Sequence, residues 1–298
     1  MIQYRRRSLA VREALWGYAM VAPLLVGFGV FFYLALVASL LIGFTEWDVL
    51  TPPRWVGLGN YARLFHNPLF YKALWNTTRY TLMSVPVGQV ISLTLALALN
   101  TRIRFRSLYR LVFFLPLLTM PFAIAVVWKW IYNPDFGLLS QLLRPLGFPR
   151  LAWLGEARWA MPALVVIALW RQSGYGMVIF LAGLQNIPCT YYEAAQVDGA
   201  NRWQQFWYIT LPLLTPTLFF SIVTALIDSF QVFDLVFVMT RGGPLNSTRT
   251  LVYNIYEDAF RYFHMGYATA TSWVLFIIIL AVTVVQWRAQ RKWVHYIL

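Results

Sequence analysis

The sequence has few charged residues and little of the chemistry that soluble enzymes use. Only 12% of its 298 residues are charged, whereas 60% are hydrophobic. That leaves too little polar surface to cover a water-soluble globule. The single cysteine, Cys189, excludes an internal disulfide and any metal site built from several cysteines. We therefore expect an integral membrane protein.

Motifs for nucleotide and metal chemistry are also missing. Neither Gly-Lys-Ser nor Gly-Lys-Thr occurs, so the chain has no P-loop to hold ATP. No paired acidic cluster or metal-ligand spacing is present, and the three histidines are scattered at His66, His264 and His295. We expect no catalytic residue, no metal site and no cofactor in this chain.

The charge that is present is strongly basic, with 24 lysines and arginines against 11 acidic residues. These basic residues lie in short runs between apolar segments, a pattern that anchors membrane helices on their cytoplasmic side. No separate basic soluble module exists, so nucleic-acid binding is not expected.

Six continuous apolar runs are long enough to cross a bilayer as helices. They are Trp16–Gly43, Leu74–Leu99, Leu108–Ile131, Trp159–Gly183, Leu213–Met239 and Ala268–Trp287. The first apolar stretch is far longer than the core of a cleavable signal peptide. The predicted fold is therefore all-α, with six transmembrane helices in one domain over residues 1–298 and a core at about 70–290.

Arginines and lysines in the short connections predict the orientation. The N-terminal tail, the connection "TRIRFRSLYR" and the C-terminal tail are all rich in arginine. In a six-helix arrangement these three segments fall on one side, which we expect to be cytoplasmic, although the opposite loops hold nine more thinly spread basic residues. Residues 187–212, between the fourth and fifth spans, lie on the same side.

This polar connection reads as two short helices joined by a glycine turn. Thr190 and Glu193 have the spacing of a helix N-cap and its partner, and Asn201 with Gln204 repeats it. Between them, Asp198-Gly199 suits a turn with positive φ. Aromatic residues follow at helical spacing, so from physics alone the segment could equally be a helix pair lying on lipid headgroups.

A motif in the same connection resolves that alternative. Glu193-Ala194-Ala195 is followed after three residues by Gly199, and after nine more by Ile209, one residue, and Leu211-Pro212. This pattern resembles the EAA loop of the membrane subunits of binding-protein-dependent ABC importers. The resemblance implies a coupling helix over 190–203 that docks on a cytoplasmic ATPase. The residues implied in coupling are Glu193, Ala194, Ala195, Asp198, Gly199, Ala200 and Trp203.

Three further stretches narrow the resemblance to the sugar-permease branch, and to the first of its two paired subunits. They are Phe113–Leu139, Asp228–Pro244 and Tyr253–Phe260. The long extracytoplasmic insertion and extra N-terminal helices of the maltose-type member are missing. The chain therefore resembles the shorter lactose, multiple-sugar and glycerol-phosphate permeases, and a glycerol phosphodiester or glycerol 3-phosphate stays open as the substrate.

The resemblance also implies partners and a location. We expect a homologous second permease, two cytoplasmic ATPase subunits that bind ATP and Mg, an external solute-binding protein, and a bacterial or archaeal plasma membrane. The rival interpretation is a secondary transporter driven by an ion gradient, although six spans without clear internal symmetry would be unusual for one.

Polar residues inside the spans are candidates for the substrate path. Arg171 and Gln172 lie in the fourth span and Asp228 and Gln231 in the fifth, at similar depth because the two helices are antiparallel. Arg171 and Asp228 are expected to pair, either along the path or simply to fasten two helices. Asp234 lies nearer the outer face, as a gate residue or one that snorkels.

Prolines and glycines mark expected bends and one expected docking turn. Pro116 and Pro121 interrupt the third span, and Gly174 with Gly176 is expected to loosen the fourth. A turn after the fifth span has glycines that would allow a binding protein to approach closely, or it is an ordinary turn. Its candidate docking residues are Gly242, Gly243 and Pro244.

Overall fold

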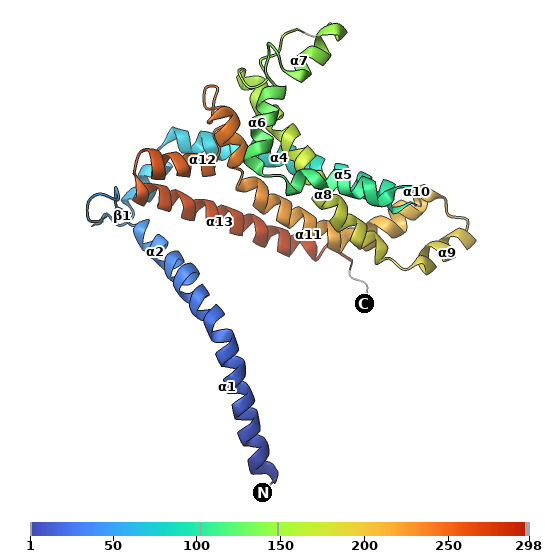
Figure 1. Cartoon of the computed structure of the whole chain (residues 1–298), viewed down its shortest axis with the longest axis horizontal. Helices are drawn as coiled ribbons and strands as arrows, with labels where there is room; N and C mark the ends of the chain where they lie inside the picture. Colours follow the sequence, from blue (N-terminus) through green and yellow to red (C-terminus); the bar gives the residue numbers. More distant parts are fainter. Residues whose placement is uncertain (1, 102, 148, 296–298) are drawn as a thin grey trace. The chain divides into compact units, whose positions relative to one another are not determined.

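The computed structural model describes residues 2–101, 103–147 and 149–295, and these are mostly helical (Figure 1). The chain forms two compact units. The smaller comprises residues up to Leu64 together with Asp258–Trp273, and the larger comprises Phe65–Glu257 and the residues from Val274 onward.

The smaller unit begins with one long helical segment made of α1 (Ile2–Phe28), a π-helical turn η1 (Gly29–Leu34) and α2 (Ala35–Ile42). This confirms the first predicted span. A short antiparallel pair follows, β1 (Thr45–Glu46) and β2 (Arg54–Trp55), and then α3 (Gly59–Phe65). The side chain of Asn60 donates hydrogen bonds to the carbonyls of Gly43 at 3.0 Å and Thr45 at 2.8 Å, which fixes the end of α2 against α3.

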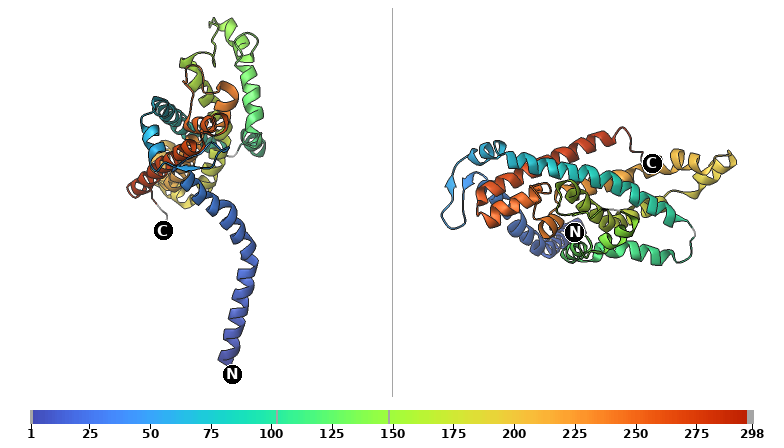
Figure 2. Two further views of the ribbon diagram at one scale, coloured as in Figure 1. Left: turned by 90° about the vertical axis from the view of Figure 1, so that its left-hand side faces the viewer. Right: turned by 90° about the horizontal axis from the view of Figure 1, so that it is seen from above.

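Three long helices build the larger unit: α4 (Pro68–Asn100), α8 (Ala157–Gln185) and α11 (Leu211–Phe230). Each of these helices packs against the other two (Figure 2). A fourth long helix, α13 (Met265–Gln290), ends in this unit. The predicted second, fourth and sixth spans are confirmed to within a few residues.

Two buried apolar clusters hold these helices together and leave a gap between them. One cluster includes Tyr80, Met161 and Ile167, and the other includes Leu99, Phe180 and Leu214. The middle turns of α4, α8 and α11 lie between the two clusters. Any polar residue on those turns is therefore positioned by well-packed helix on both sides.

The third predicted span is not one straight helix. It divides into α5 (Arg106–Leu118) and α6 (Pro121–Ile131), which meet at an angle of 97°. Pro121 opens α6, because proline is well accommodated in the first turn of a helix and cannot continue the preceding one. Pro116 lies inside α5 without breaking it. The described chain thus has five candidate spans, or six if this bent pair counts as one.

Short elements connect the long helices. After α6 come α7 (Leu138–Leu143) and a 3-10 turn, η2 (Arg144–Leu146). Between α8 and α11 lie α9 (Cys189–Val197), α10 (Arg202–Gln205) and the π-helical turn η3 (Phe206–Thr210). After α11 come η4 (Val236–Thr240), α12 (Leu251–Tyr256) and η5 (Glu257–Arg261).

The C-terminal end predicted for the fifth span is wrong. The sequence predicts a helix to Met239, but α11 ends at Phe230 and the next three residues are not helical. Gln231 caps the helix, its backbone N–H donating to the carbonyl of Asp228 at 3.1 Å. The apolar residues that continue past this point concealed the break.

Gly174 and Gly176 do not loosen α8, which is continuous through both. A β-carbon on Gly174 would clash with the backbone of Phe113 in α5, and one on Gly176 would clash with Ser92 in α4. The two glycines are therefore needed for close helix packing rather than for bending, as small residues often are between membrane helices.

Candidate functional site

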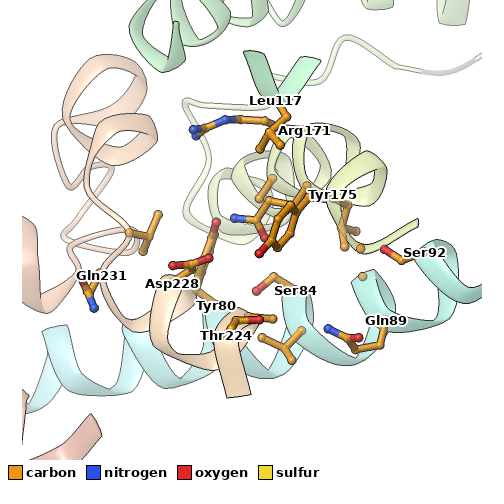
Figure 3. Close-up of a pocket in the computed structure, with 18 of the residues that line it drawn as sticks. Tyr80, Ser84, Gln89, Ser92, Leu117, Arg171, Tyr175, Thr224, Asp228 and Gln231 are labelled. Atoms are coloured by element: carbon orange, nitrogen blue, oxygen red, sulfur yellow. The ribbon is translucent and has the colours of Figure 1, made fainter. Parts of the chain in front are cut away.

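A cavity of about 530 Å³ opens among α4, α8 and α11 in the larger unit, between its two apolar clusters. Its volume is in the range of pockets that hold small molecules. Each of the three helices contributes a polar stripe at helical spacing (Figure 3). The polar lining includes Ser84, Gln89, Arg171, Gln172, Thr224 and Asp228.

The four residues predicted for the substrate path lie together in this cavity. Arg171 and Gln172 reach it from α8, and Asp228 reaches it from α11, with Gln231 just beyond the helix end. The antiparallel arrangement of the fourth and fifth spans therefore brings them to one place, as the sequence indicated.

The expected pairing of Arg171 with Asp228 is wrong. Among the described residues the two form no ion pair, and Nε of Arg171 is buried without a hydrogen-bond partner. Both side chains line the same cavity (Figure 3), and similar depth brings them to one space without bringing them into direct contact. The cavity thus contains a guanidinium and a carboxylate that are not joined to each other by an ion pair.

Asp234 also lines the cavity, whereas the sequence placed it nearer the outer face as a gate or snorkelling residue. The helix ends at Phe230, and Phe233 and Asp234, which lie where the non-helical break ends, line the same space. The hydroxyl of Thr250 donates to the carbonyl of Val232 at 3.1 Å and holds this segment in place.

Sequence reasoning missed the contribution of α4. Tyr80, Ser84 and Gln89 line the cavity from this helix, and Tyr175 joins them from α8. Gln89 is held by Ser221 of α11, whose hydroxyl donates to its side-chain oxygen at 2.8 Å. The signal was present in the sequence, because Tyr80, Ser84 and Gly88 are four residues apart in the second span.

The connection between α8 and α11 has the predicted glycine turn. Gly199 has φ +80° between α9 and α10, and apart from the glycine and its two neighbours no atom of residues 2–101, 103–147 or 149–295 lies within 4 Å of where its β-carbon would be. The second capping arrangement is confirmed: the backbone N–H of Gln204 donates to Asn201 at 2.9 Å, and that of Asn201 donates to Gln204 at 2.7 Å.

The first predicted cap is wrong. The helix α9 begins at Cys189, and Pro188 is its N-cap residue without any side-chain cap. The fixed φ of proline starts the helix one residue before Thr190 could cap it. Glu193 therefore does not take part in a helix cap, and its side chain is exposed on α9.

Side-chain contacts tie α9 and α10 firmly to the long helices. The hydroxyls of Tyr192 and Thr210 are 3.0 Å apart, linking α9 to η3, and the amide of Gln205 donates to the carbonyl of Ala200 at 3.0 Å. Tyr192 also packs on the apolar cluster that contains Phe180. In contrast, Trp203 is 73% exposed. The connection is therefore anchored at its base, where Tyr192 and Thr210 meet, and exposed at its tip, around Gly199 and Trp203.

The turn after η4 is held by contacts with other parts of the larger unit, including Tyr253 and Lys72. Gly242, at φ +78°, is buried, and a β-carbon there would lie 3.0 Å from the ring of Tyr253. Thr248 donates to the carbonyl of Gly243 at 2.7 Å, and Lys72 of α4 donates to the carbonyl of Leu245 at 2.7 Å. Gly243 and Pro244 are half-buried and belong to the more accessible side of this turn.

Within the described ranges, no group of three or more histidine, cysteine, aspartate or glutamate residues is arranged to hold a metal ion. The lining of the cavity is accordingly one of hydroxyls, amides, aromatic rings and isolated charges. Such groups can bind and orient a polar ligand by hydrogen bonding.

Comparison of the sequence with known proteins identifies the family of this chain. Residues 88–293 match the family described as binding-protein-dependent transport system inner membrane component. The probable ABC transporter permease protein YesP of Bacillus subtilis is 38% identical over 98% of this chain and 96% of its own. The lactose transport system permease protein LacF of Rhizobium radiobacter is 33% identical, covering 93% and 94%.

A solved structure shares the fold. One chain of a bacterial ABC transporter involved in the import of the acidic polysaccharide alginate superposes with a TM-score of 0.85 at 24% identity. The match covers 96% of this chain and 99% of the other.

Proposed function

The chain belongs to the family of binding-protein-dependent transport system inner membrane components, and from that premise we propose that it carries a sugar or oligosaccharide across the membrane as one subunit of an ATP-driven importer. The similarity to a lactose permease supports a sugar as the substrate. The subunit does not itself hydrolyse ATP. It would be one of two homologous permeases in the complex.

The cavity among α4, α8 and α11 is the observation that carries this proposal. Its hydroxyl and amide groups match the hydroxyls of a sugar, and Tyr175, which is 41% exposed, supplies an aromatic face on which a sugar ring can pack. We assign Arg171, Gln172, Asp228 and Gln231 to this path. Charged groups without protein partners bind hydroxyls strongly, because hydrogen bonds to ionised groups are stronger than neutral ones.

A glycerol phosphate compound is the alternative substrate, and Arg171 is the feature that favours it. Its buried Nε lacks a partner and would suit a phosphate oxygen. Asp228 and Asp234 line the same cavity and would repel that phosphate. With two carboxylates against one guanidinium, the cavity favours a neutral sugar.

We place α9 and α10 in the cytoplasm, where they would contact the ATPase subunits that bind ATP and Mg. The anchored base and exposed tip of this connection support the assignment, because movement at the tip would reach α8 and α11 directly. Both chain ends lie on the same side, in a bacterial or archaeal plasma membrane. The residues assigned to coupling are Glu193, Ala194, Ala195, Asp198, Gly199, Ala200 and Trp203.

On the opposite side, an external solute-binding protein would deliver the sugar. The turn at 241–244 is our candidate for its docking, through the accessible Gly243 and Pro244. Gly242, buried against Tyr253, would shape this turn rather than touch the partner.

Protection of a cysteine in the cavity tests the proposed path. With the exposed Cys189 changed to serine, Thr224→Cys places a thiol on the cavity wall, and Thr94→Cys places one at an exposed position of α4 outside the cavity lining. In the assembled transporter, transported sugar should slow the modification of position 224 and leave position 94 unchanged. Equal rates at position 224 with and without sugar would rule the cavity out as the path.

A further inference from the structure

Two arginines and a glutamine meet where α5 begins and α8 ends. In the orientation that its neighbours require, the side-chain oxygen of Gln185 accepts hydrogen bonds from Nη2 of Arg106 at 2.9 Å and Nη2 of Arg110 at 3.2 Å. We call these three residues the arginine cluster. The two positively charged guanidinium groups donate to the same uncharged oxygen and repel each other, so a nearby negative charge would stabilise them.

The negative charge is missing from the part of the chain that the structure describes. Neither Arg106 nor Arg110 forms an ion pair with a carboxylate there. The Nε atoms of both are buried, and no hydrogen-bond partner for either lies among the described residues. Buried donors on charged groups are costly when they lack an acceptor. The arginine cluster therefore has the donors for an anion with several acceptor oxygens.

The surface around the cluster is apolar and exposed. Leu108, Leu111 and Val112 of α5 are each more than half exposed, and next to them the guanidinium of Arg104 lies 5.2 Å from the centre of the Phe105 ring. An apolar helix face that ends in arginines is typical of the boundary between lipid tails and headgroups.

We propose that the arginine cluster binds the phosphate group of an anionic phospholipid. A phosphate offers several oxygens to the planar guanidinium groups, which bind it through paired hydrogen bonds. The lipid tails would lie along the apolar face of α5. This site is separate from the sugar cavity, and it depends only on the chain being embedded in a membrane.

Lipid binding by the purified full-length chain tests the proposal. Phosphatidylglycerol is added to the chain in uncharged detergent, with phosphatidylcholine in a parallel sample, and retained lipid is measured by native mass spectrometry beside the thermal midpoint. The variants are Arg106→Gln with Arg110→Gln, Gln185→Glu, and Arg288→Gln as a control that removes the same charge from the last turn of α13.

The wild type and Arg288→Gln should retain phosphatidylglycerol and unfold at a higher temperature with it. The double arginine variant should bind it roughly tenfold more weakly. Gln185→Glu should lose the same binding while staying folded without the lipid, because its own carboxylate replaces the phosphate. This variant keeps the test valid if the double variant folds poorly.

Three results would overturn the proposal. Equal phosphatidylglycerol binding by all variants would mean that the cluster holds no lipid. Equal stabilisation by inorganic phosphate alone would assign the site to a free anion. Loss of the second permease from the assembled complex in the arginine variants, without any change in retained lipid, would assign it to a carboxylate of that partner.

Discussion

At the scale of single residues, the cavity depends on a few polar groups held by apolar packing on either side. Arg171 and Asp228 share this space without pairing. Each charge is therefore available to a ligand, and each should contribute separately. This differs from an ion pair that fastens two helices, in which removing one partner leaves the other buried and strongly destabilises the fold.

Arg171→Gln and Asp228→Asn should each lower sugar uptake about tenfold, since each removes hydrogen bonds from a charged group to the substrate. Both variants should still assemble with the partner subunits. Asp135→Asn, which alters an exposed carboxylate next to Arg150, is the control and should transport normally. Uptake and co-purification are measured on the same preparations. Normal uptake by the doubly neutral variant would show that these residues are not part of the path.

A second prediction concerns Gly174, where α8 touches the backbone of α5. Gly174→Ala should destabilise the folded chain by about 1–3 kcal/mol, because the added methyl group has no room and a backbone must move. Gly17→Ala, where nothing lies nearby, should leave stability unchanged or slightly raised. Thermal unfolding in detergent measures both. An unchanged midpoint for Gly174→Ala would contradict the close packing of α5 and α8.

At the scale of elements, periodicity and run length were enough to predict the long helices. The second, fourth and sixth spans lie where continuous apolar residues placed them. The break at Pro121 was predictable because proline stops a helix, but the end of α11 was not, because apolar residues continue past Phe230. The polar stripe of α4 was readable at four-residue spacing and was missed because it holds no charge.

The turn between α9 and α10 depends on Gly199, whose φ is positive. Gly199→Val should strain this turn by about 1–3 kcal/mol through its positive φ alone, since no atom lies near the new side chain. We expect weaker attachment of the ATPase and loss of sugar uptake, while the subunit stays in the membrane. Glu193→Lys should have the same effects by reversing an exposed charge.

Gly147→Val provides a matched control for that strain. Gly147 has φ +79° and equally open surroundings, but it lies after η2, far along the chain from α9. It should keep ATPase attachment and uptake. Co-purification of the ATPase is measured for all three variants. Full sugar uptake in Gly199→Val and Glu193→Lys would contradict a coupling role. If Gly147→Val lost as much uptake as Gly199→Val, the loss would be explained by backbone strain alone and not by coupling.

At the scale of the whole molecule, a subunit that joins a cytoplasmic ATPase to an external binding protein requires a defined orientation in the membrane. Cysteines placed at Arg104 and Glu193 should react with a membrane-impermeant reagent only from the cytoplasmic side, and one at Arg241 only from outside. Cys189 is first replaced by serine because it is exposed. Labelling of position 193 from outside would contradict the arrangement of six spans with both ends in the cytoplasm.

The central claim is that this chain is the membrane path of an importer driven by a partner's ATPase, and sugar uptake by proteoliposomes tests it most directly. The chain is reconstituted with its second permease and ATPase subunits, with ATP and Mg enclosed and the binding protein outside. We predict uptake that requires ATP and the binding protein and is indifferent to an imposed ion gradient. Uptake by the chain alone, driven by a proton or sodium gradient without ATP, would contradict the account.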